Sequence, residues 1–108
     1  RFEKAFVMTD GFDIDRIDEV IHGRVRLGIM AFLSGAVTAD FNTLKARLQA
    51  TDGNLSAHLR KLEDAGYVAV AKSFVDRKPL TTLTLTDAGR QAFTTYLDAI
   101  GKLVDGQR

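Results

Sequence analysis

The chain has 108 residues, of which 45% are hydrophobic and 27% are charged, and its formal net charge is +1. This length suits one domain, which we expect to span residues 1–108. No apolar run approaches the roughly 20 residues of a membrane span, and the N-terminal stretch lacks the apolar core of a signal peptide. The absence of cysteine excludes disulfides and thiolate metal sites. We therefore expect a cytoplasmic protein with no membrane partner, metal or cofactor.

Charge is unevenly distributed along the chain. Residues 41–80 hold seven Lys and Arg against four Asp and Glu, whereas residues 1–40 hold five against seven. The basic middle is therefore the better candidate for a nucleic-acid surface. The early acids favour a solvated helix face, with a cation or a basic partner as the alternative. They are Asp10, Asp13, Asp15, Asp18 and Glu19.

Apolar residues at helical spacing predict a first helix over about residues 13–21. Gly23 interrupts this pattern, and a second helix follows as far as Leu33. The connection "SGAVTAD" is expected to contain a short strand at Ala36–Thr38. Asp40 is a suitable N-cap for the next helix, because its carboxylate can accept an orphan backbone N–H.

A helix-turn-helix is predicted over about residues 41–65. Its second helix is capped by Thr51 or Asp52 and ends at Gly66, which suits a left-handed C-cap. A β-hairpin follows over about residues 67–85, with strands "YVAVAKS" and "LTTLTLT" around the polar linker "FVDRKP". Thr86 then caps a last helix over about residues 87–104. The fold class is mainly α with a small β-hairpin (α+β).

The second helix of this motif turns its leucines Leu55, Leu59 and Leu62 to one side. Small residues on the opposite face allow a close approach, while Asn, Ser and Arg carry groups that hydrogen-bond base edges and Lys suits phosphate. Any exposed helix face is polar, so this pattern alone also fits plain solvent exposure. The outward residues are Gly53, Asn54, Ser56, Ala57, Arg60 and Lys61.

Three sequence blocks carry a resemblance to a known family: "RLGIMAFL", "FNTLKARLQATDGNLSAHLRKLEDAGYV" and "LTLTDAGRQAF". Over about residues 14–100 the chain resembles the MarR/ArsR-like winged-helix transcriptional regulators, and most closely the short stand-alone winged-helix DNA-binding domain family. The resemblance implies a winged helix-turn-helix fold and a prokaryotic transcription factor that acts as a homodimer. It also implies that Asn54–Ala65 enters the major groove and that the hairpin around Phe74–Pro79 is the wing.

Two features depart from that resemblance. Metal-sensing relatives carry Cys or His ligand sets, whereas this chain has no Cys and only His22 and His58, so we do not expect a metal sensor. The wing reads Asp76-Arg77-Lys78-Pro79-Leu80, without a dense Arg run. Asp76 weakens the positive field, which favours phosphate contact by Lys78 over minor-groove insertion by Arg77. Lys72, Arg77 and Lys78 are the predicted backbone contacts.

The last helix carries an apolar stripe with 3, 4, 3 spacing, as in a helix–helix seam. The stripe could pack on its own domain, but together with the first helix it offers more apolar surface than one small core needs. We therefore expect a homodimer built from the first and last helices. The predicted interface residues are Ile14, Ile17, Ile21, Phe93, Tyr96, Leu97, Ile100 and Leu103.

No residue set resembles a catalytic triad, a phosphate loop or a metal site, so we do not expect an enzyme. His58 is expected to be packed or backbone-bonded, and His22 to act as a helix cap. Arg24 and Arg26 could each bind phosphate or pair with the acidic segment. The leading function is a sequence-specific regulator that binds double-stranded DNA as a homodimer and reads an inverted repeat. The alternative is a winged-helix protein–protein interaction module without DNA binding. No residue set names a small-molecule effector.

Overall fold

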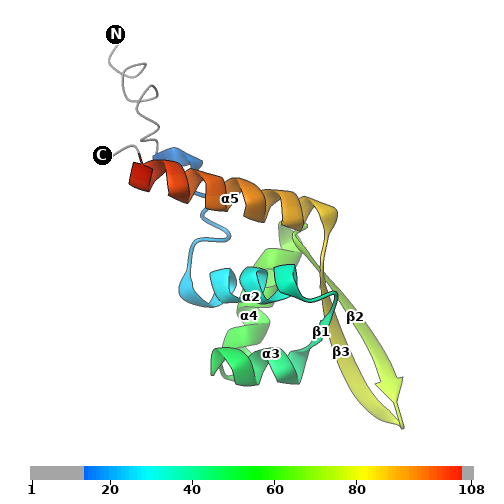
Figure 1. Ribbon diagram of the computed structural model, residues 1–108. Helices are drawn as coiled ribbons and strands as arrows, with labels where there is room; N and C mark the ends of the chain where they lie inside the picture. Colours follow the sequence, from blue (N-terminus) through cyan, green and yellow to red (C-terminus); the bar gives the residue numbers. More distant parts are fainter. Residues whose placement is uncertain (1–13, 106–108) are drawn as a thin grey trace.

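The computed structural model describes residues 14–105 and shows helices gathered beside a long hairpin (Figure 1). None of its helices is long and apolar enough to cross a membrane within this range. The elements are the 3-10 helix η1 (Ile14–Arg16), α2 (Arg24–Gly35), β1 (Ala39–Asp40), α3 (Phe41–Leu48), α4 (Asp52–Asp64), β2 (Val68–Val75), β3 (Lys78–Leu85) and α5 (Asp87–Asp105).

The helix starts follow from side-chain caps that the sequence predicts. The Asp40 carboxylate accepts the backbone N–H of Thr43 at 2.7 Å, which starts α3. The Thr51 hydroxyl accepts the N–H of Asn54 at 3.1 Å, which starts α4 and decides between the two caps expected there. Each of these bonds satisfies one of the donors that a helix N-terminus leaves unpaired. The predicted helix-turn-helix is therefore present.

The end of α4 is fixed by Gly66, whose φ is 83°. The N–H of Gly66 bonds the carbonyl of Glu63, and the N–H of Tyr67 bonds the carbonyl of Leu62, both at 2.9 Å. This pair of bonds is the Schellman arrangement, which uses a left-handed residue to end a helix. The chain reverses there and enters β2 directly.

The three strands form an antiparallel sheet in the order β1-β3-β2. The short strand expected at Ala36–Thr38 was placed too early, because it is Ala39 and Asp40 that pair with β3. Ala39 is buried and lies opposite buried Leu83, whereas Val37 is 86% exposed. Burial therefore selects the later residues for the strand.

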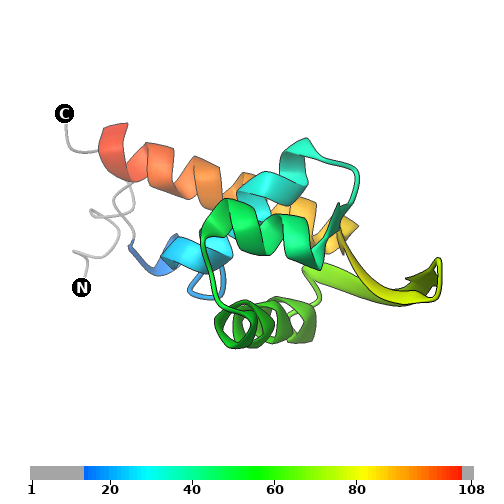
Figure 2. The same ribbon diagram turned by 90° about the horizontal axis from the view of Figure 1, so that it is seen from below.

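The hairpin is longer than predicted, because the linker expected at residues 74–79 belongs mostly to the strands. Val75 pairs with Lys78, and only Asp76 and Arg77 form the turn. Their φ angles are 52° and 69°. Two positive φ values are the requirement of a type I′ turn, whose twist matches that of the flanking strands. The hairpin consequently extends as a ribbon well away from the helices (Figures 1 and 2).

The predicted first helix over residues 13–21 is wrong in the part that the structure describes, since only Ile14–Arg16 forms a short 3-10 helix. Turns follow as far as α2. The Asp18 carboxylate accepts the N–H of Val20 at 2.8 Å, a local bond that competes with helix formation. Ile17 and Ile21 nevertheless point into the core. Asp13 lies outside the described residues.

The core lies where α2, the helix-turn-helix, the base of the sheet and α5 meet. Its largest fully buried side chains come from the turn before α2, from all three central helices and from β3. They are Ile21, Ile29, Met30, Leu33, Leu44, Leu55, Leu62 and Leu83. This core holds α4 by its leucine side and leaves the other side outside.

Candidate nucleic-acid interface

The outward face of α4 consists of the residues expected there. Leu55, Leu59 and Leu62 are buried, and the other face is exposed to solvent. A Cβ added to Gly53 would meet nothing within 4 Å, so the chain's own packing does not require a glycine at this position. The exposed residues include Gly53, Asn54, Ser56, Ala57, Arg60 and Lys61.

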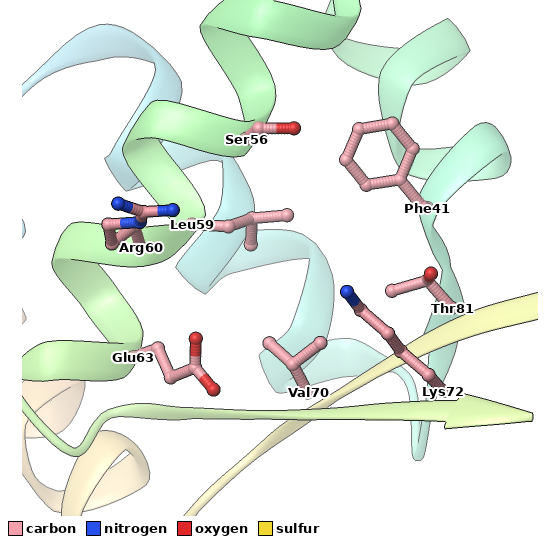
Figure 3. Close-up of a pocket in the computed structure, with 8 residues that line it drawn as sticks. All are labelled: Phe41, Ser56, Leu59, Arg60, Glu63, Val70, Lys72 and Thr81. Atoms are coloured by element: carbon pink, nitrogen blue, oxygen red, sulfur yellow. The ribbon is translucent and has the colours of Figure 1, made fainter.

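A groove of about 300 Å³ runs between α4 and the strands. Figure 3 shows the Ser56 hydroxyl pointing toward the Phe41 ring, while the Lys72 ammonium reaches in from β2. The structure thus brings together Ser56, Arg60 and Lys72, which lie on two different elements. The groove is lined by Phe41, Ser56, Leu59, Arg60, Glu63, Val70, Lys72 and Thr81.

Sequence reasoning missed several of these groove residues. Glu63 follows Ser56 and Arg60 at the i+7 and i+3 positions, so helical spacing alone places it on their side. Phe41 is only partly buried, and it forms one rim of the groove while packing against the core. Thr81 lines the groove because it pairs with Lys72 across the hairpin, and this pairing is known only from the strand register.

A surface ion pair links the two helices of the motif. The Lys45 ammonium of α3 lies 2.7 Å from a carboxylate oxygen of Asp52, in the first turn of α4. Exposed pairs of this kind contribute little to stability, typically about 0–1 kcal/mol. Their charges matter more here, because Lys45 offsets a negative charge beside the N-terminal end of the exposed face of α4.

The basic residues of the hairpin are exposed but divide between its two faces. Side chains alternate along a strand, so Lys72 and Phe74 share a face with their partners Thr81 and Pro79. Lys78 pairs with Val75 and therefore lies on the opposite face. Arg77 is the second residue of the turn. Of the three predicted backbone contacts, Lys72 alone lines the groove beside α4.

Arg26 links the segment before α2 to α4. Its Nε donates to the carbonyl of Val20 at 2.6 Å, and its Nη1 lies 2.9 Å from Nδ1 of His58. Burial lowers the pKa of His58, and the positive charges of Arg26 and Lys61 lower it further. Neutral His58 can accept a hydrogen bond from Arg26 through Nδ1. Arg26 thus bonds backbone carbonyls of the segment that holds the early acids, and Arg24 is exposed.

Two tyrosines bind the segment before α2. The Tyr67 hydroxyl donates to Asp18 at 2.6 Å, and this bond, with burial and the Asp18 charge, raises the pKa of Tyr67 to about 12. The Tyr96 hydroxyl of α5 lies 2.8 Å from Nδ1 of His22, which is therefore a side-chain partner rather than a helix cap. Burial raises the pKa of Tyr96. Of the early acids, Asp18 is thus bonded within the chain by Tyr67, whereas Asp10 and Asp13 lie outside the described residues.

The predicted dimer residues divide into a buried and an exposed group. Ile17, Ile21, Phe93 and Tyr96 are buried in the chain's own core, so their surface is already covered and the predicted interface needs this correction. Ile14 is 63% exposed and Leu97 is 51% exposed. Ile100 and Leu103 are partly buried, and Val104 next to them is 64% exposed. We call the exposed and partly buried group the α5 surface: Ile14, Leu97, Ile100, Leu103 and Val104.

The described part of the chain contains no cluster of potential metal ligands. Within residues 14–105, no three His, Cys, Asp or Glu side chains lie close enough together to hold an ion. The exposed side chains around α4 are hydrogen-bonding groups, cations and small residues, with the acids Glu63 and Asp64 toward the C-terminal end of the helix. Such a set can bind a polyanion and contact polar edges in a groove.

Several known proteins are similar to this chain in sequence or in fold. Residues 25–104 match the winged helix DNA-binding domain family. The uncharacterized protein MJ0432 of Methanocaldococcus jannaschii is 40% identical over 79% of this chain and 92% of its own length. The structure of a transcriptional regulator homologue from Pyrococcus horikoshii OT3 has a TM-score of 0.78 and 36% identity, covering 83% of this chain and 89% of that one.

A more distant structure shares the fold alone. Overoxidized AbfR, a protein of Staphylococcus epidermidis whose structure was solved bound to DNA, has a TM-score of 0.68 and 20% identity, covering 91% of this chain and 69% of that one. The family match covers residues 25–104, which is most of the chain. The family is one of DNA-binding regulators rather than enzymes. The chain belongs to the winged helix DNA-binding domain family, with the winged helix-turn-helix fold that its sequence predicts.

Proposed function

We propose that this protein is a sequence-specific transcriptional regulator that binds double-stranded DNA as a homodimer and reads an inverted repeat. The observation that carries this proposal is the exposed face of α4, which has small residues near its N-terminal end and Ser56 and Arg60 opposite Lys72. The solved DNA complex of AbfR, which has the same fold, supports DNA as the partner.

Each residue of the face has a role in this proposal. Gly53 and Ala57 let the helix backbone approach the major groove closely. Asn54, Ser56 and Arg60 read base edges, and Arg60 suits guanine because its fork matches two acceptors. The remaining cations hold phosphates and set the register of the protein on the duplex. These cations are Lys61, Lys72, Arg77 and Lys78.

A second copy of the chain would cover the α5 surface. Exposed Ile14, Leu97 and Val104 form an apolar set that extends from η1 along α5. A two-fold dimer formed there would present two α4 helices to one side of the duplex, about one helical turn or 34 Å apart. Relatives from two prokaryotes support the view that the protein works in the cytoplasm of a prokaryotic cell.

The first experiment is fluorescence anisotropy with a duplex from the protein's own promoter region and a scrambled duplex, across a salt series. We expect tighter binding to the promoter duplex, with a log–log salt slope of about −4 to −8, because several phosphates lose counterions. Equal binding to both duplexes would contradict sequence specificity. No binding at low salt would leave the protein-interaction module as the function.

The dimer is tested separately by sedimentation. Leu97→Glu places a charge in the α5 surface and is expected to shift a micromolar dimer to monomer. Thr95→Glu, at an exposed polar position of the same helix, is the matched control and should leave the dimer unchanged. A parent protein that sediments as a monomer at this concentration would contradict the dimer.

A further inference from the structure

The tip of the hairpin carries an aromatic side chain that the described chain leaves uncovered. Phe74 is 75% exposed, although it lies in a strand only two residues from the turn. It pairs directly with Pro79 across the ribbon, so the two side chains form one apolar patch. Exposed sheet edges ordinarily carry charges, and an exposed aromatic patch at such a place often marks a contact surface.

The register of the hairpin determines on which face of the ribbon this patch lies. Phe74 lies two residues beyond Lys72 on the same face, and Pro79 lies two residues before Thr81. Lys72 and Thr81 line the groove beside α4. At about 3.3 Å per residue, the patch lies roughly 7 Å further out along the ribbon from the groove. It therefore lies between the groove beside α4 and the turn of the hairpin, on the face that lines the groove.

The charges near the patch indicate what kind of molecule it binds. Arg77 and Lys78 follow in the turn and in β3, and Lys72 precedes on the same face, against the single acid Asp76. An apolar patch with Lys72 on the same face and Arg77 in the turn beyond it suits a polyanion that also offers flat apolar surfaces. Stacked bases between two rows of phosphates provide this combination.

We propose that Phe74, supported by Pro79, is an apolar wedge that enters the minor groove next to the major groove occupied by α4 and partly unstacks one base step. This proposal rests on the proposed DNA-binding function. Pro79 fixes its backbone φ and keeps the wedge rigid, while the cations hold the flanking phosphates. The wedge selects deformable pyrimidine–purine steps such as TA, because they cost least to unstack.

The test uses the full chain and duplexes of about 30 base pairs from its promoter region, each with 2-aminopurine replacing the adenine of one TA step. Unstacking makes 2-aminopurine brighter, so the parent protein is expected to raise the fluorescence of one probe. Phe74→Ala should remove this rise and weaken binding by roughly five- to 150-fold. Its salt slope should equal that of the parent, since no charge is lost.

Two variants serve as controls for the wedge. Val75→Ala truncates the neighbouring apolar residue, which is 52% exposed on the opposite face of the ribbon, and should behave as the parent. Phe74→Leu keeps an apolar wedge and should retain most of the fluorescence rise. Circular dichroism of all variants should match that of the parent, because both truncated side chains are mostly exposed.

The outcomes separate the wedge from the DNA-binding function. A Phe74→Ala protein that binds and brightens the probe like the parent would overturn the wedge alone. Equal losses for Phe74→Ala and Val75→Ala would also overturn it, because the loss would not depend on the face. A parent that binds no duplex would overturn both proposals. A Phe74→Ala protein whose sedimentation changes would show that a second copy covers Phe74 instead.

Discussion

The hydroxyl of Thr86 donates a hydrogen bond to the carbonyl of Gly66 at 2.6 Å, so the residue that caps α5 is bonded to the residue that ends α4. The same hydroxyl oxygen accepts the N–H of Gly89 at 2.9 Å. The N–H of Thr86 also bonds the carbonyl of Tyr67 at 3.0 Å. The direction of α5 is thereby fixed against the C-terminal end of α4.

Replacing Thr86 with Ala should lower the free energy of unfolding by about 1–2 kcal/mol, because the cap of α5 is lost together with the bond to Gly66. Urea unfolding followed by circular dichroism measures this change. Thr86→Ser keeps the hydroxyl and is expected to stay within about 0.5 kcal/mol of the parent. An Ala variant as stable as the parent would show that this hydrogen bond does not hold the two helices.

Two glycines of α5 should respond oppositely to alanine. A Cβ on Gly89 would overlap the backbone carbonyl of Tyr67, and backbone cannot yield as a flexible side chain can. Gly89→Ala should therefore cost about 2 kcal/mol or more. Gly101 has nothing within 4 Å of the same position, and Gly101→Ala should stabilise by about 0.5–1 kcal/mol. Thermal unfolding of both variants beside the parent tests this contrast.

The hydrogen bond between Tyr67 and Asp18 should be visible in a phenol titration. Because the bond raises the pKa of Tyr67 to about 12, the stability it provides is complete below pH 10 and is lost as the pH rises from 10 to about 12. Asp18→Asn should move the pKa of Tyr67 back toward about 10, the ordinary value. Phenolate absorbance reports this shift, with Tyr67→Phe identifying the step. A Tyr67 pKa unchanged in Asp18→Asn would contradict the assignment.

His58 should destabilise the fold at mildly acid pH. Burial and the charges of Arg26 and Lys61 lower its pKa, so the folded protein binds the proton less readily than the unfolded chain. The stability that the folded state gains from neutral His58 is present above about pH 6.5, and it is lost as the pH falls through the lowered pKa. NMR titration of the ring should show the pKa rising more in Arg26→Met than in Lys61→Met. The reverse order would contradict the contact with Arg26.

Arg60 and Lys78 should affect DNA binding in different ways. Arg60→Ala is expected to cost about 1–3 kcal/mol on the best duplex and to relax the preference at one base position. Lys78→Ala should weaken all duplexes alike and reduce the salt slope by about one. Anisotropy with a set of single-base variants of the duplex separates the two. If Arg60→Ala binds every duplex as tightly as the parent, Arg60 does not face the bases.

Local signals account for the parts of the fold that the sequence predicts well. Asp40, Thr51 and Thr86 are side-chain caps, and Gly66 takes a left-handed backbone angle, so the ends of the helices depend on residues next to them. The segment before α2 has equally clear helical spacing but forms turns. Its structure depends on Asp18, whose partner Tyr67 lies 49 residues away, and no local pattern reveals such a bond.

The candidate site shows the same division between local and distant information. A helical wheel places the outward residues of α4 correctly, and it could also have placed Glu63. The groove, however, requires the register that brings Lys72 and Thr81 opposite α4. The contact between Arg26 and His58 joins residues 32 apart. The two-residue turn was missed because Asp76-Arg77 lacks the glycine that commonly marks a type I′ turn.

Because β1 is short, it supports only the base of the hairpin. β1 pairs only with Leu83 and Thr82, so from Lys72 and Thr81 outward the hairpin is a ribbon of two strands. Ribbons of two strands twist and bend more easily than wider sheets. The tip can therefore swing while α4 stays fixed on its leucines. In the proposed complex, the hairpin can therefore follow duplexes whose neighbouring grooves differ in width while α4 keeps its position.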